Sequence, residues 1–320
     1  MKSANGIILK GVSILERFYM DKNKVIVIAG PTASGKTSLG VELAKRINGE
    51  VVSCDSMQIY KDMNIGTAKP TKEEMEGIKH YMIDIVSPDE IFNVAKYKEM
   101  AEKAIEDILS KNKVPIVVGG TGLYIDTLIN GVEFASVKED LEYRNALLER
   151  AKKEGNKALH DELAKIDKEA AEKIDMNNVR RVIRALEIYK ITGKTKTKLD
   201  EESRKETKYD YRVYGIEWGR EELYRRIEKR IDIMLEEGLV EEVKNVMSRY
   251  TISKTAIQGL GYKEVIEFLN NDISYDEMVD KLKMETRRYA KRQLTWFRRN
   301  KDIKWYDINN IADKIIMENK

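Results

Sequence analysis

Residues 30 to 37, with the sequence GPTASGKT, have the types and spacing of a phosphate-binding loop. The glycines let backbone amides point into an anion-sized nest at a helix N-terminus, and Lys36 adds a positive charge. The Thr37 hydroxyl can hold Mg²⁺ beside the phosphates. An apolar run, VIVIA, precedes the loop and a segment with helical spacing follows it, which is the setting that the motif requires. The alternative is an ordinary glycine-rich turn between a strand and a helix.

A second chemical signal is an acid at the end of a strand-like segment, EVVSCD, which ends at Asp55. In an open α/β sheet, ligands lie at the carboxyl ends of the strands, so Asp55 should face the phosphate loop. A nucleoside-triphosphate hydrolase usually has a further strand that ends in an acid, and a residue that places the attacking water. Here the segment VPIVVGG ends at Gly119 and Gly120 instead, and Thr121 follows. The phosphate loop therefore predicts phosphate binding without specifying hydrolysis.

The elements around these residues predict an α/β fold. Strand-like runs alternate with helical patterns up to about residue 132, which favours a P-loop-NTPase-like core with a mostly parallel sheet. Residues 133–194 lack strand patterns and are expected to form an all-helical insertion domain. The run YRVYGIEW predicts another core strand, followed by long charged helices to the C-terminus. We therefore expect a core of residues 20–132 and 195–320, and residues 1–19 are expected to be an extension outside the fold.

The amino-acid composition indicates the cellular compartment but does not indicate a binding partner. The 320 residues include 58 Lys and Arg against 55 Asp and Glu, so only local charge clusters can indicate a partner. The single cysteine, Cys54, excludes an internal disulfide and fits a reducing compartment, so we expect a cytoplasmic protein. No apolar stretch is long enough to span a membrane. His80 and His160 lack the spacing of a metal site, which favours structural roles for both.

Four motifs in order resemble those of the bacterial tRNA dimethylallyltransferases, also called tRNA isopentenyl transferases. They are GPTASGKT, DSMQIY at 55–60, NIGTAKP at 64–70 and VGGTGLY at 118–124. The likeness continues through RRVIRALEIY at 180–189, RIEKRIDIML at 226–235, GLGYKE at 259–264 and RRYAKRQLTWFR at 287–298. The resemblance implies that this chain transfers a prenyl group from dimethylallyl diphosphate to the exocyclic amine of the adenine 3' of the anticodon in tRNA.

The resemblance also implies roles for individual residues. Asp55 matches the general base, Thr121 the hydroxyl near the bridging diphosphate oxygen, and Arg230 the catalytic arginine. Each has a plainer alternative: a turn cap, part of a tight glycine turn, and a solvated helix face. Mg²⁺ is the implied cofactor, with Thr37 as its protein ligand. The residues implied to bind the diphosphate are Gly30, Pro31, Thr32, Ala33, Ser34, Gly35, Lys36 and Thr37.

A basic segment near the C-terminus, RRYAKRQLTWFRRNKDIKW, interleaves aromatic residues with cations, a pattern that suits contacts with RNA phosphates and bases. It could equally be an amphipathic helix whose Leu294 and Phe297 face the core. Gln58 is expected to hydrogen-bond the edge of the flipped adenine. The residues implied to contact tRNA are Asp55, Ser56, Met57, Gln58, Thr121, Arg144, Arg180, Arg181, Arg184, Gln258, Gly261, Tyr262, Lys263, Arg287, Arg288, Lys291, Arg292 and Gln293.

Three other functions share parts of this pattern. A small-molecule kinase uses the same loop, and a prenyltransferase of free adenine nucleotides shares the loop and the acid. A non-catalytic RNA-binding module could retain an inactive loop, but the residues implied to be catalytic are all present. The expected partners are tRNA and dimethylallyl diphosphate, with no membrane partner, and the protein is expected to be a monomer.

Overall fold

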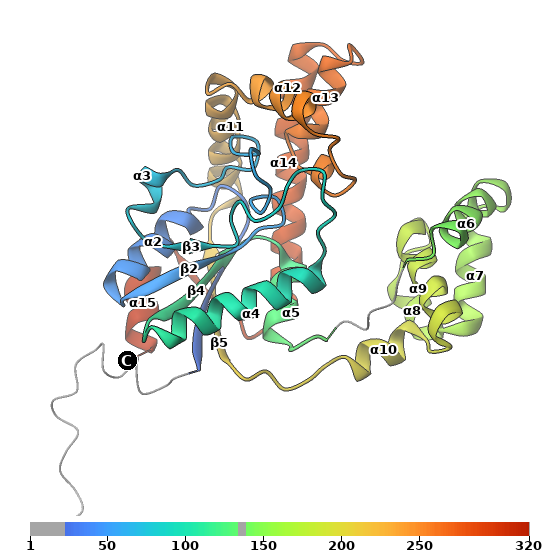
Figure 1. The fold of residues 1–320 in the computed structure, drawn as a ribbon, viewed down its shortest axis with the longest axis horizontal. Coiled ribbons are helices and arrows are strands. Elements are labelled where there is room, and N and C mark those ends of the chain that lie inside the picture. Colours follow the sequence, from blue (N-terminus) through green and yellow to red (C-terminus); the bar gives the residue numbers. More distant parts are fainter. Residues whose placement is uncertain (1–22, 134–138, 320) are drawn as a thin grey trace, which may run out of the picture. The chain divides into compact units, whose positions relative to one another are not determined.

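The computed structural model describes residues 23–133 and 139–319 (Figure 1). The expected extension at residues 1–19 lies outside the described part of the chain. The described residues form two compact units, divided between Ile129 and Asn130 and again between Thr207 and Lys208. The second division lies later in the chain than the expected boundary at residue 194, because the helix that follows residue 194 packs with the insertion.

The first unit is built on a six-stranded sheet in the order β3-β2-β4-β1-β5-β6, and every neighbouring pair is parallel. This confirms the predicted α/β class with a P-loop-like parallel sheet. Ala29 in β1 and Cys54 in β2 both pair with Gly119 in β4, so the carboxyl ends of the three strands meet at one edge. The strands are β1 (Lys24–Ala29), β2 (Gly49–Cys54), β3 (His80–Tyr81), β4 (Val114–Gly119), β5 (Asp210–Glu217) and β6 (Lys304–Asp307).

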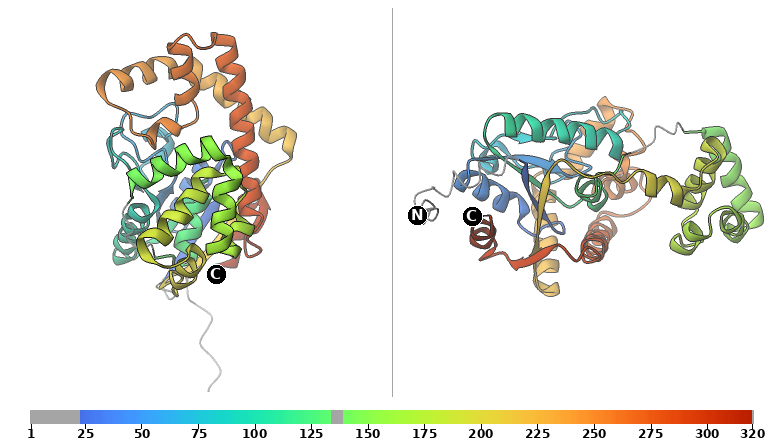
Figure 2. Two further views of the ribbon diagram at one scale, coloured as in Figure 1. Left: turned by 90° about the vertical axis from the view of Figure 1, so that its right-hand side faces the viewer. Right: turned by 90° about the horizontal axis from the view of Figure 1, so that it is seen from below.

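Helices bury both faces of this sheet, which is why its central strands are apolar throughout. Ile26 and Ile28 pack in one core with α2 (Lys36–Arg46) and α15 (Ile311–Glu318). Val25 and Val27 belong to the other core, with α4 (Val94–Ser110) and α5 (Gly122–Ile129). Figure 2 shows α4 and α15 on opposite sides of the sheet.

Most of the remaining helices of this unit lie beyond the carboxyl edge of the sheet, while α3 (Lys72–Met75) lies beside α2 (Figure 1). The longest, α14 (Tyr275–Phe297), begins with a capping box formed by Ser274 and Glu277 and packs against both α11 and α13. The others are α3 (Lys72–Met75), α11 (Arg220–Glu236), α12 (Leu239–Arg249), the 3₁₀ turn η1 (Ala256–Gln258) and α13 (Tyr262–Leu269).

The C-terminal part of the chain departs from the expectation of helices throughout. The basic helix ends at Phe297, and Lys304–Asp307 forms the edge strand β6. Trp305, expected on the basic segment, packs over Gly215 of the neighbouring strand, where an added Cβ would lie 2.5 Å from the indole ring. A four-residue edge strand between short turns carries too little local pattern to be recognised in sequence. The two-residue strand β3 likewise carries too little local pattern to be recognised in sequence.

The second unit is helical, as expected of the insertion. Its core includes Leu147, Leu163, Val182 and Leu186. Its last helix packs here because the Asp167 carboxylate accepts hydrogen bonds from the Thr197 amide at 2.9 Å and the Thr197 hydroxyl at 2.7 Å. The unit therefore extends past residue 194. Its helices are α6 (Leu141–Glu154), α7 (Asn156–Ile166), α8 (Lys168–Lys173), α9 (Val179–Thr192) and α10 (Lys196–Glu202).

Candidate active site

The phosphate loop connects β1 to α2, as its motif predicts. Ala33 and Gly35 have positive φ angles of 62° and 89°, which turn the chain sharply before the helix begins at Lys36. The Lys36 ammonium donates to the carbonyl of Pro31 at 2.5 Å and so lies over the loop. Burial, and next the charge of Arg230, lower the pKa of Lys36 to about 7, while Asp55 opposes that shift. Three charged candidates therefore lie close enough to influence one another.

Side chains from the start of α11 and the turn before it hold the back of this loop. Arg226 donates to the carbonyl of Ala33 at 2.9 Å, and the Trp218 indole donates to the carbonyl of Ser34 at 2.9 Å. The guanidinium of Arg226 also lies 4.6 Å from the centre of the Trp218 ring. These bonds use loop carbonyls, which would repel an anion, and leave amides at the helix N-terminus for a phosphate.

The loop retains two hydroxyls that suit a diphosphate and its metal ion. Ser34 Oγ is buried and has no hydrogen-bond partner in the described chain. The Thr37 hydroxyl, half-buried at the start of α2, likewise accepts and donates no hydrogen bond within the residues that the structure describes. The described residues contain no group of three or more His, Cys, Asp or Glu that could hold a metal. A Mg²⁺ ion here would therefore take most of its ligands from the diphosphate and water, as Mg²⁺ commonly does.

The two carboxylate oxygens of Asp55 have different hydrogen-bonding environments. Oδ1 accepts the backbone amides of Met57 at 2.8 Å and Gln58 at 3.3 Å, which caps the turn after β2. No described residue donates a hydrogen bond to Oδ2. The turn cap and the general base, which were alternatives in sequence, are thus compatible because each uses its own oxygen.

Thr121 lies beside Asp55 because the carboxyl ends of β2 and β4 are neighbours in the sheet, where Cys54 pairs with Gly119. Its amide donates to the carbonyl of Cys54 at 3.2 Å, and its hydroxyl accepts the amide of Ser56 at 3.0 Å. Tyr289 of α14 lies close enough to Asp55 and Thr121 for both to influence its phenol. Burial, and next the charge of Asp55, raise the pKa of the Tyr289 phenol above its usual value, so this phenol keeps its proton.

Arg230 reaches the same region from α11. Burial lowers its pKa below the ordinary value, opposed by the charges of Glu74 and Asp55. Among the described residues the guanidinium has no hydrogen-bond or ion-pair partner. An unpaired, half-buried guanidinium near Lys36 is suited to meet the charge of an incoming anion.

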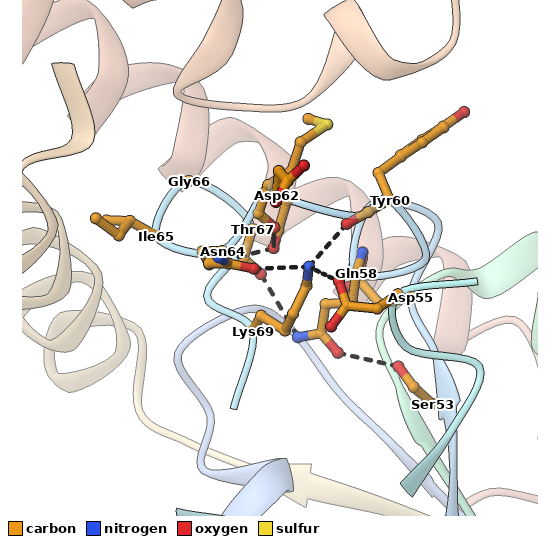
Figure 3. Close-up of polar contacts among 12 residues, drawn as sticks. Ser53, Asp55, Gln58, Tyr60, Asp62, Asn64, Ile65, Gly66, Thr67 and Lys69 are labelled. Atoms are coloured by element: carbon orange, nitrogen blue, oxygen red, sulfur yellow. Dashed lines mark hydrogen bonds and ion pairs between the residues drawn. The ribbon is translucent and has the colours of Figure 1, made fainter. Parts of the chain in front are cut away.

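Gln58, which is expected to contact the adenine edge, hydrogen-bonds within the protein in this structure. Its Oε1 accepts the Ser53 hydroxyl at 3.0 Å and its Nε2 donates to the carbonyl of Ala68 at 3.0 Å (Figure 3). The side chain thereby ties the turn after β2 to the loop at residues 64–70. In this structure Gln58 shapes the wall of the site, because both ends of its amide are engaged within the protein.

Two residues that sequence reasoning left without a role hold that same loop. The Lys69 side chain, only 5% exposed, donates to the carbonyl of Tyr60 at 2.7 Å and to Asn64 Oδ1 at 2.9 Å (Figure 3). It also donates to Asp84 at 2.5 Å. Glu242 of α12 accepts three successive backbone amides, at residues 64 to 66, at 2.7 to 3.0 Å. Lys69 lies in a recognised motif, whereas no sequence signal marks Glu242.

The residues implied to contact tRNA divide into exposed and buried ones. Gln258, Lys263, Arg288, Lys291 and Arg292 are exposed, and Arg287 is half-buried and forms an ion pair with Glu228. In the insertion unit Arg180 and Arg181 are exposed, whereas Arg144 and Arg184 both bind Glu187.

Gly261, Tyr262 and Gln293 depart from the expected tRNA surface. Tyr262 is buried and its phenol donates to Glu242 at 2.9 Å, while Gly261 is buried with a φ of 93°. Gln293 is 6% exposed and both ends of its amide are bonded inside the protein. These three positions form the packing beneath the surface, because they lie on the inward sides of α13 and α14.

Comparison with known proteins identifies the family. The model of a family described as IPP transferase matches residues 58–300. A tRNA dimethylallyltransferase from Acetivibrio thermocellus is 54% identical over 300 residues, covering 93% of this chain and 96% of that protein. One from Halothermothrix orenii is 51% identical over 296 residues, covering 92% of this chain and 90% of that protein.

Solved structures agree with these relatives. The full-length tRNA isopentenylpyrophosphate transferase from Bacillus halodurans matches with a TM-score of 0.69 and 43% identity, over 92% of this chain and 95% of that one. A eukaryotic dimethylallyltransferase acting on tRNA matches with a TM-score of 0.74 and 34% identity, over 91% of this chain and 72% of that one. The chain therefore belongs to the IPP transferase family, whose members include the tRNA dimethylallyltransferases.

Proposed function

We propose that the protein transfers the dimethylallyl group of dimethylallyl diphosphate to the exocyclic amine of the adenine 3' of the anticodon in tRNA, and releases diphosphate. The observation that carries this proposal is the position of Asp55 beside Thr121, at the edge of the sheet where the phosphate loop begins. There Oδ2 of Asp55 accepts no hydrogen bond from any described residue. A base and an anion site at one edge suit displacement of a diphosphate by a weakly acidic amine.

The diphosphate would bind on the loop amides and beside Lys36 and Arg230. Mg²⁺, bound to the diphosphate and the Thr37 hydroxyl, would supply further positive charge against the leaving group. The hydroxyl of Thr121, held by the amide of Ser56, would reach the oxygen that bridges the diphosphate to the prenyl carbon. Fixed donors of this kind stabilise the charge that grows on the leaving group.

In the transfer step, the amine nitrogen of adenine forms a bond to the first prenyl carbon. The bond from that carbon to the diphosphate oxygen breaks, and its electron pair leaves with the diphosphate. The amine proton passes to Oδ2 of Asp55 as the new bond forms. Because the amine is a very weak acid, loss of the proton together with bond formation demands less of the carboxylate than prior deprotonation would.

The acceptor is proposed to be tRNA rather than a free nucleotide because α14 exposes Arg288, Lys291 and Arg292. Such cations can bind RNA phosphates, which a free nucleotide does not require in this number. A tRNA substrate also favours the cytoplasm as the place of reaction. No described helix has the length and apolar character to cross a bilayer.

The test is transfer of radiolabelled dimethylallyl diphosphate, with Mg²⁺, to unmodified tRNA that has adenine 3' of the anticodon. AMP and a tRNA lacking that adenine serve as alternative acceptors. Label only in the first tRNA is the expected result, whereas label in AMP would reassign the protein to free-nucleotide prenyltransferases. Phosphate transfer from ATP to a small hydroxyl acceptor, with no prenyl transfer, would indicate a kinase.

The same assay separates an enzyme from a binding module. Asp55→Asn removes the base and should lower the transfer rate by about 10² to 10⁴-fold while tRNA still binds. Asp89→Asn, at an exposed position after β3, is the matched control and should keep the wild-type rate. Equal rates for the two variants would remove Asp55 from the mechanism.

A further inference from the structure

Gln293 connects two loops that the proposed reaction needs in a fixed relation. We propose that it is a positioning residue, which sets the distance between the phosphate loop and the turn that carries Thr121. The inference rests on the proposed function, because it assigns the diphosphate to the first loop and the bridging oxygen to Thr121.

The Gln293 amide bonds to both loops at once. Its Oε1 accepts the backbone amide of Thr32 at 2.9 Å, and its Nε2 donates to the carbonyl of Gly120 at 2.9 Å. A carboxamide offers an acceptor and a donor on one rigid plane, so glutamate or an apolar side chain cannot make both bonds. At 6% exposure these bonds are shielded from competing water. We call this pair of bonds the Gln293 bridge.

The backbone lies very close to the Gln293 amide at this bridge. A Cβ added at Gly120 would lie 2.2 Å from Gln293 Nε2, so only glycine allows the amide to approach that carbonyl. The bridge also occupies the amide of Thr32, which is therefore not among the loop amides that can donate to the diphosphate. Thr32 and Gly120, which both lie in the sequence motifs, therefore each use a backbone group to bind Gln293 of α14.

Neighbouring turns of α14 contact the same segment. Trp296 packs on Gly122, where a Cβ would lie 2.3 Å from the indole Cδ1, and its Nε1 donates to Asp126 at 2.8 Å. Tyr289, one turn before Gln293, lies close enough to Thr121 to be influenced by it. Residues 289, 293 and 296 lie on one face of the helix. This face therefore contacts residues 120–126, and Gln293 extends that contact to the phosphate loop.

Loss of the bridge should slow transfer more than it weakens tRNA binding. A misplacement of reacting groups by about 1 Å can cost roughly 10²-fold in rate. Gln293→Met removes both bonds in a similar volume. Gln293→Glu keeps the acceptor for Thr32 but places an acceptor against the Gly120 carbonyl. Asp280→Met, at an exposed position of the same helix, is the control for the substitution itself.

The measurements are kcat, the KM for each substrate and the dissociation constant for tRNA, in variants whose melting temperature shows that they are folded. We expect kcat to fall by about 10 to 10²-fold in both Gln293 variants, with tRNA affinity within about twofold of wild type. Unchanged kcat would overturn the proposal. Weaker tRNA binding with unchanged kcat would overturn it too, and would make Gln293 an RNA contact.

A second measurement uses the unaltered protein, so it does not depend on how the variants fold. Amide-resolved NMR should show slow hydrogen exchange at Thr32, and inorganic diphosphate with Mg²⁺ should shift the amide signals of Gly35 and Lys36 more than that of Thr32. Fast exchange at Thr32, or a Thr32 signal that shifts most, would contradict the bridge. Failure of the wild-type protein to prenylate tRNA would refute the proposed function while this measurement still tests the bridge.

Discussion

Arg144 of α6 donates two hydrogen bonds, each 2.8 Å long, to the fully buried carboxylate of Glu187 in α9. Arg184 forms a further ion pair with the same carboxylate, and the amide of Asp140 donates to it at 2.8 Å. Two of the arginines that the family resemblance assigns to tRNA are thus also the partners of a buried acid. Their contribution to RNA binding and to the stability of the insertion unit must be measured separately.

Glu187→Gln should destabilise the insertion unit by about 3 kcal/mol, because it leaves the two arginines without their anionic partner. Denaturant unfolding followed by a probe in residues 141–192 would measure this loss. Glu172→Gln, at an exposed position of α8, is the matched control and should change the free energy of unfolding by less than about 0.5 kcal/mol. Equal unfolding free energies for Glu187→Gln and Glu172→Gln would show that the ion pairs of Glu187 do not stabilise the unit.

The Glu187 carboxylate should make the free energy of unfolding depend on pH. Burial acts to raise the pKa of Glu187, but the hydrogen bonds from Arg144 and Arg184 outweigh it, and the pKa falls below its ordinary 4.5. A lowered pKa in the folded state gives stability that is present above pH 4.5 and lost as the pH falls through the folded value. The difference in unfolding free energy between wild type and Glu187→Gln should therefore shrink below pH 4.5. A constant difference down to acid pH would contradict this assignment.

Glu242→Ala should loosen the loop at residues 64–66, since three backbone amides lose their shared acceptor. Hydrogen bonds to a charged group contribute about 1.5 to 3 kcal/mol, so we expect a loss of roughly 2 kcal/mol in unfolding free energy. Hydrogen exchange at residues 64–66 should become faster. Tyr262→Phe removes only the phenol bond to Glu242 and should leave that exchange unchanged. Protection that survives in Glu242→Ala would exclude this role.

Arg230→Met should lower kcat by about 10² to 10³-fold, because it removes a preorganised cation from the leaving group. Arg225→Met on the same helix is the control, since the Arg225 side chain is 78% exposed and pairs only with Glu222 among the described residues. Single-turnover transfer with saturating tRNA measures the chemical step. Similar rates for the two variants would place Arg230 outside the reaction.

Lys291→Met should reduce the dependence of tRNA affinity on salt. A cation that neutralises one phosphate contributes about one unit to the slope of log affinity against log salt. The measurement is a series of binding curves at increasing salt for wild type and variant. Lys314→Met, on α15, should keep the wild-type slope. A slope unchanged in Lys291→Met would remove the exposed face of α14 from the RNA interface.

Part of the site could be predicted because its residues are consecutive. The loop from Gly30 to Thr37 and the turn after β2 carry their geometry in local backbone preferences and hydrogen bonds. Asp55 was placed near the loop by the general rule that ligands bind at the carboxyl edge of parallel strands, and the register of β1, β2 and β4 satisfies that rule. By contrast, β6 and the later boundary of the insertion depend on packing partners that no local pattern reveals.

The sequence by itself determined the family, the parallel α/β core and the identity of the phosphate loop and its acid, because all of these reside in short motifs and in periodic burial. Only the tertiary structure decided which motif residues face a substrate and which support the fold. Gln293 and Thr32 are 261 positions apart, yet they share one hydrogen bond, and Glu242 caps a loop far from it in the chain. Such pairings follow from how the helices pack on the sheet, and a side chain's own identity does not specify its partner.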